Sequence, residues 1–147
     1  MFKHILVPTD GSDLSQATVA CAVSFAKEAG ARVTLFYAEA PTPSFYAGLG
    51  AIADPHVMQE ARERLDGAAQ QVLDAASQIA QAAGVPYERL VLEGHKPYAL
   101  IIQAAEQQGC DLIFMASHGR RGMDALLLGS ETNKVLTHSK IPVLVYR

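Results

Sequence analysis

The sequence of 147 residues has no tryptophan, only two cysteines and no long hydrophobic run. Cys21 and Cys110 lie far apart and form no C-x-x-C pair, so we expect two reduced, mostly buried thiols without a redox role. Apolar runs such as Ile141–Val145 are far shorter than the roughly 20 residues that a membrane helix needs. The start of the chain lacks the apolar segment of a secretion signal. Together these absences predict a soluble, cytoplasmic protein with no membrane partner.

The sequence also has no excess of positive charge. Its 12 Lys and Arg residues against 15 Asp and Glu give a formal net charge of -3 at pH 7, which argues against nucleic acid as a partner. Three catalytic signatures are missing: the G-x-x-x-x-G-K-[ST] phosphate loop, the H-E-x-x-H metal spacing and the G-x-S-x-G nucleophile elbow. We therefore expect no P-loop NTPase, no metal site built by the protein and no serine hydrolase.

Short β-branched runs alternate with longer helical patterns along the whole chain. This alternation predicts an α/β fold: a single domain over residues 1–147 with a doubly wound, Rossmann-like, five-stranded parallel sheet flanked by four helices. The predicted strands are His4–Pro8, Arg32–Ala38, Tyr87–Leu92, Asp111–Ala116 and Pro142–Tyr146. The predicted helices run from a cap at Ser12 or Asp13 to Ala29, and over His56–Ala83, Tyr98–Gln107 and Ser130–Thr137.

Apolar spacing predicts which faces of the first two helices are buried. The first face consists of Leu14, Ala17, Cys21, Phe25 and Ala29, and the second of Met58, Ala61, Leu65, Ala68, Val72, Ala76, Ile79 and Ala83. Between the second strand and the second helix, the segment Glu39–Pro55 holds three of the seven prolines. It predicts a surface excursion, either a lid or a plain loop.

Doubly wound sheets bind ligands beyond the carboxyl ends of their strands, near the point where the strand order reverses. At the end of the fourth predicted strand, Ala116–Gly122 contains two glycines, a histidine and two arginines, and Gly129-Ser130 stands directly before a helix. Glycines let backbone N–H groups approach an anion, and a helix N-terminus adds free N–H groups. The layout predicts a phosphate site. The alternative is that the glycines shape a turn and Ser130 caps the helix.

A carboxylate lies on the same predicted rim, because Asp10 follows the first strand. It can accept hydrogen bonds from a ribose hydroxyl or an adenine amino group. The alternative is an Asx turn that orders the Asp10-Gly11 corner.

Four segments resemble the universal stress protein family in its small, single-domain form. They are Ile5–Ser12, Asp111–Gly119, Leu126–Ser130 and Pro142–Val145. The ATP-binding branch of that family is marked by Gly, two residues, Gly, nine residues, and then Gly followed by Ser or Thr. Gly119 and Gly129-Ser130 match the second and third elements, whereas Ala116 replaces the first glycine. The resemblance covers essentially the whole chain.

The resemblance implies an ATP site, or one for ADP or AMP, with Mg²⁺ carried by the phosphates. It places Pro8, Thr9, Asp10 and Ala38 around the adenosine, Met115 and Ala116 at the entrance to the phosphate loop, and Gly119, Arg120, Gly129, Ser130 and Glu131 along the phosphates. His118 is expected to touch a phosphate or to be a water-exposed turn residue. A carboxylate competes with an anion at a helix start, so Glu131 favours fewer phosphates or points away.

The last predicted strand is apolar, and in a sheet of this kind it leaves an open edge. The resemblance implies a homodimer joined through Val143, Leu144 and Val145, and the alternative is an edge covered by the chain's own helices.

The expected function is that of an ATP-binding stress-response protein that acts as a sensor or regulator with an unidentified protein partner. Two alternatives are a dimeric interaction protein that binds no nucleotide and a slow ATPase that uses Asp10 or His118 to place water.

Overall fold

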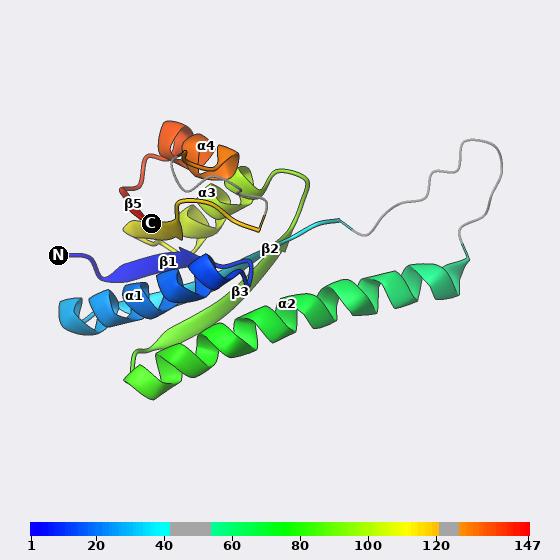
Figure 1. The fold of residues 1–147 in the computed structure, drawn as a ribbon, viewed down its shortest axis with the longest axis horizontal. Helices are drawn as coiled ribbons and strands as arrows, with labels where there is room; N and C mark the ends of the chain where they lie inside the picture. The colour runs from blue at the N-terminus through cyan, green and yellow to red at the C-terminus, as the bar shows by residue number, and fades with distance from the viewer. Residues whose placement is uncertain (42–53, 121–126) are drawn as a thin grey trace.

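Five parallel strands form the centre of the fold, in the order β3-β2-β1-β4-β5 (Figure 1). The computed structural model describes residues 1–41, 54–120 and 127–147. The elements are β1 (His4–Pro8), α1 (Asp13–Ala29), β2 (Arg32–Glu39), α2 (Pro55–Ala83), β3 (Tyr87–Glu93), α3 (Pro97–Gln107), β4 (Leu112–Ala116), α4 (Ser130–His138) and β5 (Val143–Tyr146). The predicted strands and helices are thus confirmed, with ends that differ by one residue at most.

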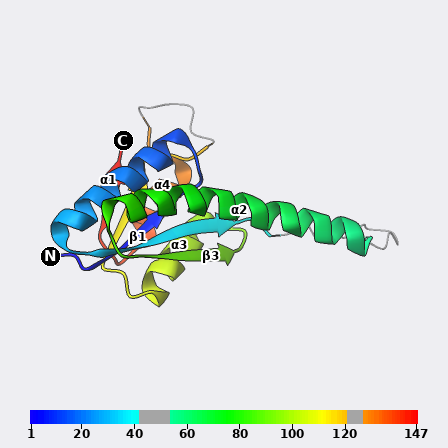
Figure 2. The same cartoon turned by 90° about the horizontal axis from the view of Figure 1, so that it is seen from below.

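The helices cover the two faces of the sheet in pairs (Figures 1 and 2). Helices α1 and α2 pack together on one face, and α3 and α4 pack together on the other. The chain winds outward from β1 to β3, then returns to the other side of β1 to form β4 and β5. The strand order therefore reverses between β1 and β4, which makes that pair the topological switch point of the sheet.

Local sequence signals set the helix ends. Of the two predicted caps for α1, Ser12 is the N-cap, and its hydroxyl accepts a hydrogen bond from the backbone N–H of Ser15 at 3.2 Å. Gly30 ends α1 and Gly84 ends α2 with φ of 62° and 70°, a left-handed conformation that glycine adopts without strain. The carboxylate of Asp54 caps α2 by accepting the N–H of His56 at 2.9 Å.

The predicted buried faces of α1 and α2 are partly wrong. In α1 the buried side chains centre on Val19 and Val23, while Ala17 is exposed. In α2 the fully buried side chains belong to Ala69, Leu73, Ala76, Ser77 and Ala80, while Ala68 is exposed. Both helices are rich in alanine, which fits either face of a helix, so the larger residues decide how the helix is rotated.

The two sides of the sheet carry separate cores. The core under α1 and α2 includes the fully buried Ile5, Leu35 and Leu73, and the core under α3 and α4 includes Leu6, Phe36 and Ile113. Cys21 is half-buried and Cys110 is buried, and both are free thiols, as expected. None of the helices in the described part of the chain is long and apolar enough to cross a membrane.

Helix α2 is longer than the strands that it covers. Its 29 residues span about 43 Å, and none of its residues before Ala69 is fully buried. Figures 1 and 2 show this first half projecting past the carboxyl ends of β2 and β3. The fully buried contacts of α2 with the rest of the fold therefore come from its second half.

Candidate functional site

The loops that follow β1 and β4 meet at the switch point. The backbone N–H of Arg120, in the loop after β4, donates a hydrogen bond to Oδ2 of Asp10, in the loop after β1, at 2.8 Å. A Cβ atom placed on Gly119 would lie 2.5 Å from the same oxygen, so the β4 loop can approach this closely because residue 119 is glycine. The structure thus brings Asp10, Gly119 and Arg120 together, as the sequence predicted.

Asp10 also forms the Asx turn that the sequence offered as an alternative. Its Oδ1 accepts the N–H of Ser12 at 3.0 Å. The same carboxylate therefore organises its own corner with one oxygen and reaches the other loop with the second. Burial is the largest influence on the Asp10 pKa and raises it. Hydrogen bonds from Ser12, Arg120 and Ser15 outweigh burial and hold the pKa below its ordinary value, so the carboxylate is ionised at neutral pH.

The β1 loop is held by hydrogen bonds to a residue of α1 that the sequence analysis did not identify. Ser15, buried in the first turn of α1, shares a hydrogen bond of 2.7 Å between its hydroxyl and that of Thr9. The same hydroxyl accepts the N–H groups of Asp10 and Gly11 at 3.3 and 3.2 Å. A small polar residue in the first turn of the helix, directly after the Asp10 loop, was the available signal. Thr9 itself is buried, so its backbone rather than its side chain borders the rim.

The start of α4 is pinned to the end of β4. The N–H of Gly129 donates to the carbonyl of Ser117 at 2.8 Å, and the buried hydroxyl of Thr132, also missed from sequence, donates to the carbonyl of Ala116 at 3.0 Å. A Cβ on Gly129 would lie 3.2 Å from Cα of His118, so a side chain at position 129 would crowd the β4 loop. The two glycines at positions 119 and 129 keep this loop close to its neighbours.

Gly129, not Ser130, is the N-cap of α4, and it makes no side-chain capping bond. Ser130 is the first residue of the helix and is exposed. The alternative in which Ser130 caps the helix is therefore wrong. A helix start without a side-chain cap leaves backbone N–H groups available to an external acceptor.

Glu131 points away from the helix start. Its Oε2 accepts the N–H of Tyr98, in the first turn of α3, at 2.8 Å, and its Oε1 pairs with Nζ of Lys134 at 3.1 Å. The carboxylate therefore serves the N-terminus of α3, where a negative charge is favourable. Of the two expectations for Glu131, its contacts agree with the one in which it points away.

The remaining predicted residues lie at the same edge of the sheet. Pro8 ends β1 and is half-buried, as is Ala38 near the end of β2, whereas Met115 and Ala116 end β4 and are buried. The ring Nδ1 of His118 lies 3.1 Å from the hydroxyl of Ser117 inside the loop. A contact between His118 and a phosphate stays a prediction. Arg121 and Gly122 lie outside the described residues, as does most of the predicted excursion, residues 42–53.

The predicted surface excursion begins one residue too early, because its first residue, Glu39, is part of a strand. Glu39 belongs to β2, is 7% exposed, and its Oε1 has no hydrogen-bond partner among the described residues. Burial first, and then the charges of Asp66 and Glu93, raise the pKa of this carboxyl, while Arg62 lowers it. The alternation of side chains along a strand turns Glu39 under α2, on the face that Tyr37 also occupies.

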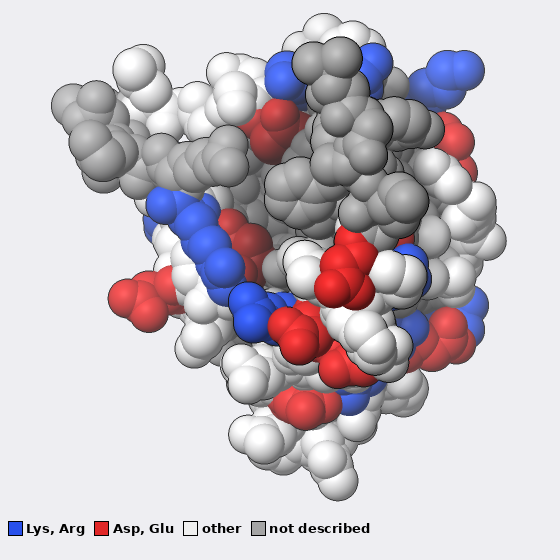
Figure 3. All heavy atoms as spheres, turned by 90° about the vertical axis from the view of Figure 1, so that its right-hand side faces the viewer, with Lys and Arg blue, Asp and Glu red and all other residues white. Residues whose placement is uncertain are grey.

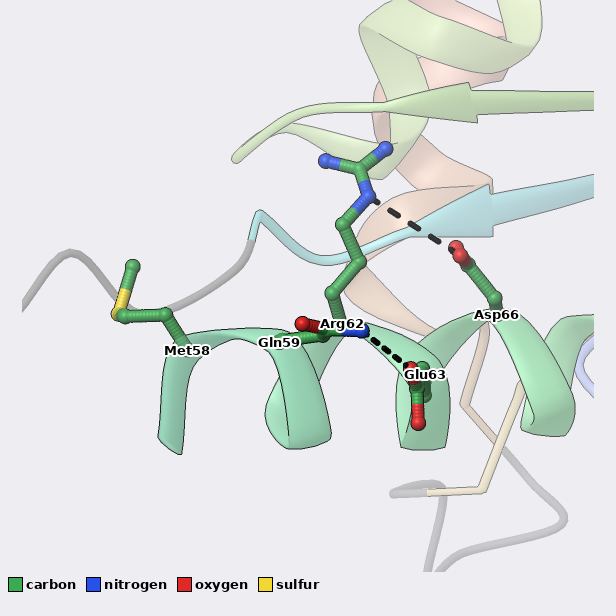
Figure 4. Close-up of a pocket in the computed structure, with 5 residues that line it drawn as sticks. All are labelled: Met58, Gln59, Arg62, Glu63 and Asp66. Carbon is green, nitrogen blue, oxygen red and sulfur yellow. Dashed lines mark hydrogen bonds and ion pairs between the residues drawn. The ribbon is translucent and has the colours of Figure 1, made fainter. Parts of the chain in front are cut away.

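A cavity of about 490 Å³ lies on the first half of α2 rather than at the switch point. Its lining is Met58, Gln59, Arg62, Glu63 and Asp66 (Figure 4). These side chains mostly pair with each other, as Gln59 does with Glu63 at 3.0 Å and Arg62 with Asp66 at 4.0 Å. On the face seen in Figure 3, Lys and Arg side chains of the described residues are interspersed with Asp and Glu. The cavity contains none of the predicted site residues.

A doubly wound sheet whose β1 and β4 loops meet at the point of strand reversal defines the class of α/β proteins that hold ligands at this edge. A family model described as the Universal stress protein family matches residues 1–147, and the chain belongs to that family.

Relatives and solved structures agree with the family and the fold. The universal stress protein encoded in the QAH/OAS sulfhydrylase 3' region of Thermus aquaticus is 33% identical over 147 residues, which cover 100% of both chains. Universal stress protein UspA from Lactobacillus plantarum has a TM-score of 0.79 at 28% identity, with 99% of this chain and 97% of that chain covered. A universal stress protein in complex with cAMP has a TM-score of 0.73 at 26% identity, with 99% and 97% covered.

Proposed function

We propose that this stress-family protein binds an adenine nucleotide, first of all ATP, in the crevice between the β1 and β4 loops, and acts as a sensor or regulator. One observation carries the proposal: the Asp10 carboxylate joins the two loops at the switch point, beside a helix start that has no side-chain cap. The cAMP complex of a relative with 26% identity supports a nucleotide of this class. ADP and AMP are the other candidates.

The phosphate side of the proposed site consists of Gly119, Arg120, Gly129 and Ser130. The two glycines keep side chains out of the loop, the exposed Ser130 hydroxyl adds a donor, and the guanidinium of Arg120 supplies positive charge. Ala116 is buried at the end of β4, so its methyl group adds little bulk to the crevice. The residues present therefore fit a chain of phosphates.

The adenosine side consists of Pro8, the backbone of Thr9 and Asp10, and Ala38. Pro8 and Ala38 are half-buried and apolar, which suits the faces of a purine ring. No group of three or more His, Cys, Asp or Glu side chains within residues 1–41, 54–120 and 127–147 is arranged to hold a metal. Mg²⁺ would accordingly be bound through the phosphates.

A homodimer joined through β5 completes the proposal. Carbonyls of Pro142 and Tyr146 accept hydrogen bonds from the N–H groups of Ile113 and Ser117, in β4 and directly after it, at 2.9 and 2.7 Å. Because alternate residues of a strand face opposite neighbours, the backbone N–H and C=O groups of Val143 and Val145 face the open edge. All residues of β5 are half-buried, so a second β5 would cover apolar surface as well as pair these groups. The protein would work in the cytoplasm, where the nucleotide is available.

Calorimetric titration of nucleotide-free protein with ATP and Mg²⁺ tests the site. Saturable binding near one ligand per chain is expected, and Gly119→Val should abolish it, because a branched side chain meets the Asp10 carboxylate. Gly67→Val is the matched control, since a Cβ on Gly67 meets nothing within 4 Å. Absence of binding in the wild type would favour the interaction protein without nucleotide. Phosphate release that disappears in Asp10→Ala would favour the slow ATPase.

A further inference from the structure

Each oxygen of the Asp10 carboxylate serves a different loop. Oδ1 accepts the N–H of Ser12 within the β1 loop, and Oδ2 accepts the N–H of Arg120, 110 positions further along the chain. A carboxylate accepts hydrogen bonds only, so it is suited to hold two backbone N–H groups at once. Asp10 therefore connects the part of the proposed site that faces the adenosine with the part that faces the phosphates.

The hydrogen bond between Asp10 and Arg120 requires a residue without a side chain at position 119. Its Cβ position lies 2.5 Å from Oδ2 of Asp10, closer than real Cβ contacts allow, so a side chain at position 119 would push the carboxylate away from the N–H of Arg120. Gly119 does not have a positive φ. The need for glycine is thus one of space rather than of backbone conformation.

The charge of Asp10 argues against direct contact between its carboxylate and the phosphates of a nucleotide. An ionised carboxylate repels a polyphosphate at short range. Backbone N–H groups disperse that charge, and they can do so only while the carboxylate stays bound to both loops.

From these contacts, and resting on the proposed function, we infer that Asp10 is a positioning residue: its carboxylate holds the amide of Arg120 and so fixes the phosphate side of the site, rather than binding the adenosine. The binding of adenosine, a nucleoside without phosphates, should then not depend on the bond between Asp10 and Arg120. This differs from the role in binding adenosine that the family resemblance implies for Asp10.

Two substitutions break the bond from opposite sides. Asp10→Asn keeps an oxygen for the Asx turn, which asparagine forms as readily as aspartate, and places an NH₂ group opposite the N–H of Arg120. Gly119→Ala displaces the carboxylate from the other loop. Asp13→Asn is the control for exchanging a carboxylate for an amide next to the β1 loop, because Asp13 is exposed in the first turn of α1. Gly67→Ala is the control for added bulk.

Calorimetry with ATP–Mg²⁺ and with adenosine separates the two roles of Asp10. Hydrogen bonds to charged groups predict that Asp10→Asn and Gly119→Ala each weaken ATP binding by about tenfold to a hundredfold. Adenosine binding should change by no more than about twofold, and both control variants should keep the wild-type ratio of ATP to adenosine affinity. Equal losses for ATP and adenosine, or no loss for either, would overturn the inference.

A measurement without nucleotide tests the bond itself. Hydrogen exchange of the Arg120 amide, followed by NMR in the nucleotide-free protein, should be slow in the wild type and at least about tenfold faster in Asp10→Asn. Equal exchange rates in the two proteins would refute the bond. If the wild type binds no ATP, the proposed function fails, and the exchange rates still decide whether Asp10 holds the β4 loop.

Discussion

Replacing the buried Glu39 by glutamine is expected to stabilise the protein at neutral pH. Glu39 is 7% exposed, one of its oxygens has no partner in the described part of the chain, and it lies in register with Glu93 on β3. On α2, Asp66 adds a second negative charge near this carboxyl and Arg62 a positive one. Arg62 is shared, because it also lies 3.7 Å from Glu93 and 4.0 Å from Asp66.

The magnitude follows from the buried negative charge. A buried polar group with incomplete hydrogen bonding costs roughly 1–3 kcal/mol, and more when it is charged. Arg62 offsets part of this cost for Glu39 and glutamine keeps a polar oxygen, so we expect a gain of about 1 kcal/mol in Glu39→Gln from loss of the charge. In a domain of about 150 residues this corresponds to a rise in Tm of about 2–4 °C. Glutamine keeps the shape of the side chain and adds an N–H donor among carboxylates.

The gain should depend on pH in a defined direction. The folded protein raises the pKa of Glu39 above the ordinary value of 4.5, so the folded state binds the proton more tightly than the unfolded state. The contribution of Glu39 to wild-type stability therefore falls as pH rises from 4.5 through its folded pKa, and the gain in Glu39→Gln grows over the same interval. Below pH 4.5 both side chains are neutral and the two proteins should be about equally stable.

Urea denaturation at pH 4 and at pH 8 measures both effects. Glu28→Gln is the control, because it removes one exposed carboxylate from α1 and changes the net charge equally. A loss of stability in Glu39→Gln at pH 8, or a gain of the same size at pH 4, would refute the reasoning about the buried carboxylate.

Three further predictions concern separate parts of the fold. Val145→Pro removes an N–H from the open edge of β5, where proline is tolerated, and should convert the proposed β5 dimer into folded monomers by light scattering; an unchanged mass would contradict an interface through β5. His4 is buried with its pKa below 6.5, so acid destabilises the wild type below about pH 6.5, and His4→Gln should flatten that dependence in urea titrations. Glu131→Ala should lower stability by about 1 kcal/mol through the lost cap of Tyr98, and a tenfold fall in ATP affinity would contradict its assignment away from the phosphates.

The sequence predicted the sheet well because its strands are short apolar runs bounded by turns. Val7, Leu35 and Ile113 have almost no alternative to a buried strand, and right-handed crossovers then give the doubly wound order. The helix faces were predicted less well. In α1, alanines such as Ala17 and Ala22 are equivalent in a pattern, and the packing of α2 and the sheet decides which of them is buried.

The candidate site was also predicted only in part, because some of its contacts depend on tertiary packing. The glycines and Asp10 could be assigned to one rim, because the carboxyl ends of parallel strands share an edge. The bond from Arg120 to Asp10 could not be predicted, since it joins loops 110 positions apart. Glu39 was misplaced because it opens a segment that holds three of the seven prolines, whereas pairing with β3 extends the strand to include it.

The projecting half of α2 affects how the molecule behaves in flow. A rod of several helical turns beyond the sheet increases friction without adding mass, so the protein should elute from a sizing column ahead of a compact chain of 15.7 kDa. Elution volume alone would then overestimate the mass of a monomer. Sedimentation equilibrium, which does not depend on shape, is the appropriate measure of assembly for this fold.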